Sequence, residues 1–458
     1  MKREGFRSRL GFLLVSAGCA IGIGNVWKFP YVAGENGGGV FLLFYLLFLA
    51  AFGTPLLSME LAVGRAGRGS AVNALKTLES QGQKWHLLGW MGLLGCYLLM
   101  MFYTTVSGWM LCYFFRYATG YFDGLSSAAA IRSAFYSLLN SPFQMIFWLI
   151  LIIVAGFMVC GKGIAKGLER VTKPMMIALL ILLIILVINS LTLDKAAEGL
   201  SYYLLPDFEK AASRGLGKVI SAAMSQAFFT LSIGLSSMQI FGSYMSDERT
   251  IVSESVRICA LDTFVAVSAG LIIFPACFTY GIEPSSGPSL IFEALPNVFA
   301  NMPAGRLWGT LFYLFMTFAS FSTITAVFQN IVAGCTENLG WSKKKALTFN
   351  TVALTLLSLP CVFGFNKLSH ISITKIGNIL SIEDFIVSNM LLPVGCLAYL
   401  LFCVYKEGWG FDSFINEANR GGGICFPSSK GFRFYLGYIL PLAIVLIFIQ
   451  GLVGIFKA

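Results

Sequence analysis

Apolar stretches of about twenty residues recur along the whole chain, and short segments that hold most of the charges separate them. An α-helix of that length crosses the ~30 Å hydrocarbon core of a membrane. Eleven such stretches are present, at 10–38, 40–61, 88–115, 142–160, 174–193, 219–244, 258–281, 307–336, 346–364, 377–404 and 434–456. The pattern predicts an all-α polytopic membrane protein that forms a single transmembrane domain over residues 1–458.

The composition agrees with this pattern. Hydrophobic residues make up 57% of the chain, charged residues only 12%, and the mean hydropathy is +0.77. A soluble protein of this length could not bury so much apolar surface. The 11 cysteines stand singly, without a CxxC pair or a Cys/His cluster, so we expect buried, unreactive thiols.

The net charge of +10 follows the expected topology. If the N-terminus lies inside and the connecting segments alternate, inside segments hold 21 of the 32 Lys and Arg residues and outside segments hold 10. Because cytoplasmic loops are enriched in Lys and Arg, this asymmetry predicts a multi-pass protein of the cell (inner) membrane with a cytoplasmic N-terminus and an outside C-terminus. The basic balance therefore indicates a chain surrounded by membrane lipid, without a nucleic-acid partner.

Two of the stretches contain glycine and polar residues where a membrane helix should be most regular. The first includes "GCAIGIGNVWKFP" at 18–30; as one helix it would be roughly 43 Å long, and its glycines favour a break near 22–24. The sixth includes "TLSIGLSS" at 230–237. Interrupted helices at corresponding positions predict a five-plus-five inverted repeat, with halves at about 10–193 and 219–404 and an extra C-terminal helix at about 434–456.

Unwound backbone is tolerated within a membrane only where it lines a cavity. There its carbonyl groups can bind a cation and its N–H groups an anion, and an amino acid carried with Na⁺ needs both. An alternative is that Gly18 and Gly22 form a small-xxx-small helix-packing motif. Ionisable residues within apolar stretches, at Glu60, Asp262 and Asp384, favour a functional site.

Three segments resemble the neurotransmitter:sodium symporters. They are "RLGFLLVSAGCAIGIGNVWKFPYVAGENGGGVFLLFYLL" at 9–47, "FFTLSIG" at 228–234 and "ASFSTITAVFQN" at 319–330, which are similar to the first, sixth and eighth helices of that family. The resemblance covers the whole chain, and the bacterial eleven-helix amino-acid transporters, the leucine-transporter-like type, are the most similar. It implies a sodium-coupled symporter that imports amino acids by alternating access.

The resemblance implies two Na⁺ sites built from oxygen ligands, which suit a hard cation. The first would use the Ala20 carbonyl, Asn25, Thr230 and Asp262. The second would use the carbonyls of Gly18, Ile21 and Ala319 and the hydroxyls of Ser322 and Thr323, although hydroxyls in membrane helices often bond to their own backbone. No chloride requirement is expected, because Asp262 supplies a negative charge and Ala266 stands where chloride-dependent members carry serine.

The resemblance also implies a substrate site. The Tyr103 hydroxyl and the Gly24 amide would hold the carboxylate of the amino acid, and Phe229 would close over it. The side-chain pocket would be shaped by Leu99, Val106, Ser232, Leu235, Thr323 and Val327. Because this pocket is largely apolar, we expect an apolar or aromatic L-amino acid, and neither a charged amino acid nor a monoamine.

Two gates and one brace follow from the same resemblance. Lys28 and Asp384 would form the outer gate, where Lys replaces the usual Arg and lacks its bidentate fork. Arg3 and Glu337 would form the inner gate, surrounded by Ser243, Tyr244 and Gln329. Glu60 would brace the unwound part of the sixth helix. Pro174 lies closer to Gly167 than the corresponding proline of many relatives, so the sequence leaves the inner opening undecided.

Other classes of function are less consistent with the sequence. A membrane channel, or a receptor-like amino-acid-binding protein without coupled transport, is the alternative, but no repeated filter motif is present. An enzyme is not expected, because the chain has only 2 histidines and "GIGN" does not follow a strand as a nucleotide fingerprint would.

Overall fold

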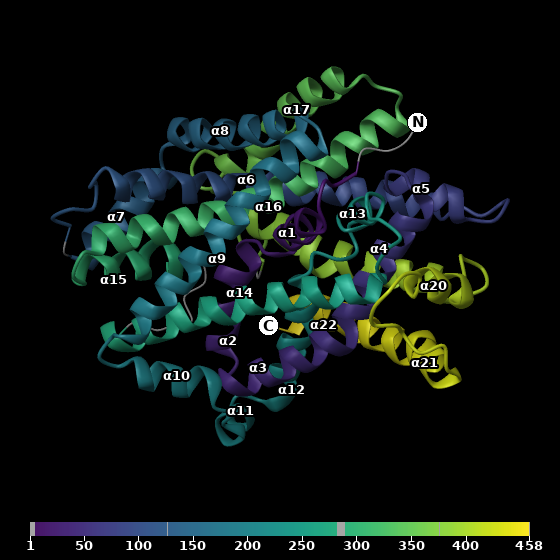
Figure 1. Ribbon diagram of the computed structural model, residues 1–458. Helices are drawn as coiled ribbons and strands as arrows, with labels where there is room; N and C mark the ends of the chain where they lie inside the picture. The colour runs from purple at the N-terminus through teal and green to yellow at the C-terminus, as the bar shows by residue number, and fades with distance from the viewer. Residues whose placement is uncertain (1–4, 126, 282–288, 375, 458) are drawn as a thin grey trace.

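The computed structural model describes residues 5–125, 127–281, 289–374 and 376–457, which fold into a bundle of helices; these residues contain no β-strand. Short helices of the connecting segments gather at the two ends of the bundle (Figure 1). At the left end lie α7 (Ala128–Leu139), α10 (Ala196–Leu204) and α15 (Leu295–Asn301), and at the right end lie α5 (Ala71–Leu78), α20 (Phe411–Ala418) and α21 (Lys430–Phe434). In the topology predicted from the charges, the left end is outside and the right end inside.

Nine helices in the described ranges are long and apolar enough to cross a membrane. They are Gly39–Gly67 (α3, η2 and α4), His86–Ala118 (α6), Pro142–Gly161 (α8), Ile164–Leu191 (η3 and α9), Ile251–Tyr280 (α14), Gly305–Asn338 (α16), Lys343–Phe363 (α17), Ile379–Val404 (α18, η5 and α19) and Lys430–Val453 (α21, η6 and the start of α22). Each falls on one of the predicted stretches.

The remaining two predicted stretches are the interrupted ones. The first consists of α1 (Arg9–Ala20) and a second helical piece, Gly24–Glu35 (η1 and α2), bent by 56° at the break. The sixth begins as α12 (Leu216–Phe229), loses helical structure, and resumes only as the short α13 (Gln239–Gly242). Both predicted interruptions are therefore confirmed.

The backbone of the sixth span shows why the helix stops. Ser232, Gly234 and Ser236 have φ values of +51°, +99° and +58°, in the left-handed region that right-handed helices exclude. Only one of the three is a glycine, so two serines hold a conformation that costs about 1 kcal/mol or more each. The Ser237 hydroxyl donates to the Ser232 carbonyl at 2.9 Å, which stabilises the turn locally.

The fifth span begins earlier than predicted, with the π-helical turn η3 at Ile164 rather than at residue 174. Its first residues include Lys166, Glu169 and Arg170, which lower the local hydropathy although they continue the helix. Pro174 lies inside α9 (Glu169–Leu191), where it cannot donate the backbone hydrogen bond to the carbonyl one turn earlier.

The described part of the connecting segment at 282–306 folds back into the protein. Leu290, Ile291 and Phe292 in η4 (Leu290–Ala294) are fully buried, and the Phe292 ring packs against Trp109 and Tyr113 of α6. Residues 282–288 lie outside the described ranges. The segment therefore covers the end of the bundle on which α7 lies.

Candidate functional site

A cluster of three polar side chains forms where the break in the first span meets the sixth span and α14. Asn25 Nδ2 donates to Asp262 Oδ1 at 2.7 Å and to Thr230 Oγ1 at 3.1 Å, and Thr230 Oγ1 donates to Asp262 Oδ2 at 2.8 Å. All three side chains are buried, and Ala20 lines the cavity beside them. The four residues expected at the first Na⁺ site therefore lie together, with one carboxyl group that can balance a cation.

A second group of oxygen atoms lies between the first span and α16. Ser322 Oγ is 2.8 Å from both the Gly18 and the Ala319 carbonyl oxygens. Thr323 Oγ1 is 3.2 Å from the Gly18 oxygen, 3.3 Å from the Ile21 oxygen and 3.4 Å from the Ala319 oxygen. These five oxygens fit a hard cation by their chemistry. Both hydroxyls lie within hydrogen-bond distance of the Ala319 carbonyl in their own helix, as is common for hydroxyls in membrane helices. Both also lie within that distance of the Gly18 carbonyl in the interrupted first span.

A small cavity of about 30 Å³ adjoins the first cluster. Its lining includes the predicted substrate residues Gly24, Leu99, Tyr103, Phe229, Ser232, Leu235 and Thr323. The Tyr103 hydroxyl accepts the N–H of Ile23 at 3.0 Å, so it faces the break in the first span. Two other predicted pocket residues, Val106 and Val327, are buried in the same apolar cluster as Leu99 and Leu235, and Val106 also lines a larger vestibule.

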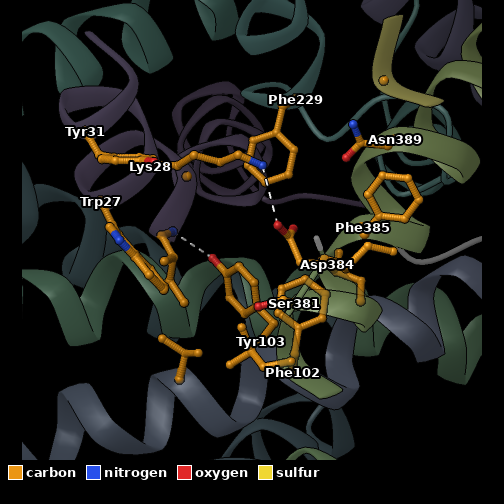
Figure 2. A pocket seen from close by; sticks show the side chains of 17 residues that line it. Trp27, Lys28, Tyr31, Phe102, Tyr103, Phe229, Ser381, Asp384, Phe385 and Asn389 are labelled. Carbon is orange, nitrogen blue, oxygen red and sulfur yellow. Dashed lines mark hydrogen bonds and ion pairs between the residues drawn. The ribbon is translucent and has the colours of Figure 1, made fainter. Parts of the chain in front are cut away.

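The vestibule has a volume of about 500 Å³ and adjoins the small cavity. Gly24, Leu99, Tyr103 and Phe229 line both spaces. Figure 2 shows the Lys28 ammonium between the Phe229 ring and the Asp384 carboxylate. Lys28 Nζ is 3.7 Å from Asp384 Oδ2 and 3.7 Å from the centre of the Phe229 ring. The predicted outer pair therefore forms, and its cation also rests on the aromatic ring between the two spaces.

Glu60, on α4 (Thr54–Gly67), is fully buried beside the unwound part of the sixth span. One of its carboxylate oxygens accepts the N–H of Gly234, and the other accepts the N–H of Met238 at 3.2 Å. These N–H groups have lost their helical acceptors, so the carboxylate takes the place of the missing turn. Glu60 thus lies where the brace was expected.

At the opposite end of the path, the predicted inner-gate residues fall into two places. Glu337 accepts the backbone N–H of Ser70 at 2.6 Å, whereas Gln329 donates to the Tyr244 hydroxyl at 3.4 Å. Ser243 is buried, and its hydroxyl donates to the Ile240 carbonyl at 2.5 Å. Arg3, the expected partner of Glu337, lies outside the described residues.

The structure adds residues that the sequence did not single out. Val387 and Leu392, near the two ends of the π-helical turn in the tenth span, line the small cavity. The only feature of the sequence that pointed to this region is the polar pair Ser388 and Asn389, which interrupts an apolar run. Near the N-terminus, Glu169 accepts the N–H of Arg7 at 2.7 Å and the hydroxyl of Ser8 at 2.9 Å. The early start of the fifth span makes this contact possible.

Comparisons with known proteins identify the family of this chain. The model of the sodium:neurotransmitter symporter family matches residues 3–123 and 132–457. The uncharacterized sodium-dependent transporter YhdH of Bacillus subtilis is 35% identical over 448 residues, which cover 98% of this chain and 97% of that protein. An uncharacterized sodium-dependent transporter of Haemophilus influenzae is 31% identical over 469 residues and 98% of each chain.

Among solved structures, the crystal structure of MhsT in complex with L-phenylalanine has a TM-score of 0.88 and 36% identity, and the match covers 98% of this chain and 100% of that one. The all-α inverted-repeat fold with two discontinuous helices is the fold of this match. The family consists of transporters and not enzymes, and no comparison supports a channel. The chain belongs to the sodium:neurotransmitter symporter family and is a sodium-dependent membrane transporter.

Proposed function

We propose that this transporter carries an apolar or aromatic L-amino acid together with two Na⁺ ions. The observation that carries the proposal is the lining of the small cavity, which combines polar groups with apolar side chains. Asn25 and Thr230 of the first oxygen cluster, the Tyr103 hydroxyl and the Gly24 backbone are the groups to which the ammonium and carboxylate of an amino acid can bind. Leu99, Phe229, Leu235, Val387 and Leu392 provide the apolar lining.

The same lining argues against charged substrates and monoamines. A charged side chain would lose its hydration without gaining a partner, which is costly, whereas burying a Leu- or Phe-sized side chain contributes ~1.5–3 kcal/mol. A monoamine brings no carboxylate to the cation site. A side chain at Gly22 could not replace that carboxylate, because a Cβ there would lie 2.3 Å from the Tyr103 hydroxyl. The L-phenylalanine bound to the related MhsT supports an aromatic substrate.

The two ions would bind at the two oxygen clusters, one beside the substrate and one between the first span and α16. Chloride is not required in this proposal, because Asp262 is fully buried in the first cluster and supplies the negative charge. The charge distribution supports a cytoplasmic N-terminus, so the vestibule would face outward and the cycle would import its substrate by alternating access.

Uptake into proteoliposomes tests the substrate class. Labelled L-phenylalanine should accumulate only with an inward Na⁺ gradient, and Leu, Met, Tyr and Trp should compete better than Glu, Lys or a monoamine. The Tyr103→Phe substitution should raise KM because it removes a carboxylate donor. Tyr113→Phe is the matched control, since Tyr113 lies on the same helix but donates to the Phe292 carbonyl at 3.1 Å. Better competition by Glu, Lys or a monoamine would refute the proposed substrate class.

A further inference from the structure

A second concave surface lies away from the transport path, between the neighbouring ends of α6 and α8. This groove has a volume of about 410 Å³. Most of its lining is aromatic: Phe115, Tyr121, Phe143, Phe147 and Trp148. Arg116 is the one charged residue among the described residues that line it. The groove lies at the end of the bundle that carries α7. We therefore expect it at the level of the membrane surface on the vestibule side.

Arg116 is half-buried and uses only part of its hydrogen-bonding capacity. One Nη donates to the Ala134 carbonyl at 2.9 Å and the other to Gln144 Oε1 at 3.4 Å, and the guanidinium lies 4.7 Å from the centre of the Tyr121 ring. Within the described ranges it has no acidic partner. A guanidinium has five N–H donors, so three remain for an anion, and a planar cation of this kind binds phosphate well.

An apolar stripe leads from the groove along α8 towards the membrane centre. Phe147, Leu151, Val154 and Met158 are 54%, 41%, 37% and 63% exposed, and their spacing places them on one face of the helix. Exposed apolar side chains on a spanning helix face lipid. A molecule with a phosphate at Arg116 could therefore lay a hydrocarbon chain along this stripe.

We propose that this groove is a binding site for an anionic phospholipid of the leaflet on the vestibule side. The phosphate binds Arg116, the glycerol region lies against the aromatic side chains, and one acyl chain follows the stripe on α8. A zwitterionic phospholipid binds more weakly because its own cation competes with Arg116 for the phosphate. A free anion binds more weakly because it makes no use of the aromatic and apolar surface.

Native mass spectrometry of the full-length protein in detergent tests the site, with phosphatidylglycerol and phosphatidylcholine of identical acyl chains as probes. Wild type should bind phosphatidylglycerol roughly tenfold more tightly, because the choline cation of phosphatidylcholine competes with Arg116 for the phosphate. Arg116→Gln should abolish this preference. Arg132→Gln is the matched control: it removes a charge from α7 at the same end of the bundle, where the Arg132 side chain is 65% exposed, and it should keep the preference. Phe147→Ala should weaken both lipids without changing their ratio.

Three results would overturn the proposal: equal binding of the two lipids by wild type, an unchanged preference in Arg116→Gln, or binding of glycerol 3-phosphate as tight as that of the lipid, which would indicate a plain anion site. Arg116 also holds α7 through the Ala134 carbonyl, so Arg116→Gln could fail to fold. The wild-type comparisons decide the proposal even then, because they need no variant.

Discussion

Glu60→Gln is the substitution that tests the unwound sixth span most directly. The amide has nearly the shape of the carboxylate, so packing around this fully buried position is preserved. One of the two acceptor oxygens becomes an NH₂ group, however, and that group then faces a backbone N–H, either that of Gly234 or that of Met238. Two donors point at each other, and one backbone N–H loses its only acceptor.

The size of the effect follows from this arrangement. A buried N–H left without an acceptor costs about 1–3 kcal/mol, and a hydrogen bond to a charged group is worth ~1.5–3 kcal/mol. We take about 2–3 kcal/mol as the stabilisation that the unwound conformation loses. The ratio of binding-competent molecules to all others then falls by roughly 30- to 140-fold. The apparent Kd for sodium-dependent binding of L-phenylalanine should rise by the same factor, because affinity scales with that population.

Thermal unfolding monitored with a thiol-reactive dye is a suitable assay, since ten of the cysteines are buried and Cys425, which is exposed, can be replaced by serine. Glu60→Gln should lower Tm and largely remove the stabilisation by Na⁺ and L-phenylalanine. Glu383→Gln is the matched control. It is also a buried carboxyl group in a membrane span, 6% exposed, but its Oε2 has no hydrogen-bond partner among the described residues.

Replacing Glu383 by glutamine keeps the shape of a buried side chain that makes no contact with the unwound sixth span in any described hydrogen bond, so Tm should stay close to that of the wild type. The contrast between the two variants carries the test. If Glu60→Gln keeps wild-type ligand stabilisation, or if both variants lose the same amount, the carboxylate does not support the unwound segment in the way described.

Three further outcomes are expected. Gly24→Ala should raise KM at least tenfold, because the added Cβ would lie 2.8 Å from the Phe229 ring; unchanged uptake kinetics would contradict this. Lys28→Arg should slow labelling of a vestibule cysteine in the substrate-bound protein by a few fold, since a partly exposed pair with Asp384 is worth ~0–1 kcal/mol and Arg can pair in a bidentate way; faster labelling would count against it. Replacing chloride by gluconate should leave uptake unchanged. A fall to background would show that the Asp262 carboxyl group alone does not supply the negative charge that transport needs.

The spans and the two interruptions could be predicted because they depend on local composition. Runs of apolar residues define the spans, and glycines with polar neighbours define the breaks at 22–24 and 230–237. The start of the fifth span could not be read in this way. Its first turn carries charges, and Glu169 is buried only because the N-terminal segment folds onto it from far away in sequence.

The candidate site shows the same division. Asn25 and Asp262 stand out because polar groups in apolar stretches are rare, and the resemblance to the family implied their place, with Thr230, at a Na⁺ site. Val387 and Leu392 were not singled out, since an apolar residue that lines a cavity looks like any other apolar residue of a membrane helix. Val327 stays a prediction for the same reason: it is buried in the apolar core, and a helix register alone does not say which apolar side chain reaches a cavity and which packs beside it.

The Lys28–Asp384 pair and the N-terminal contacts close the two ends of the path with unequal strength. At the vestibule end a single ion pair spans 3.7 Å, with both side chains about one-third exposed. At the other end, Glu169 ties the segment before α1 to the fifth span through both Arg7 and Ser8. In the proposed alternating-access cycle, we therefore expect empty molecules to rest mostly with the site connected to the vestibule. A solute arriving from the opposite side would meet only the small fraction that has opened there, and its apparent affinity would fall by that fraction. One set of binding residues would then give the two directions of transport different apparent affinities.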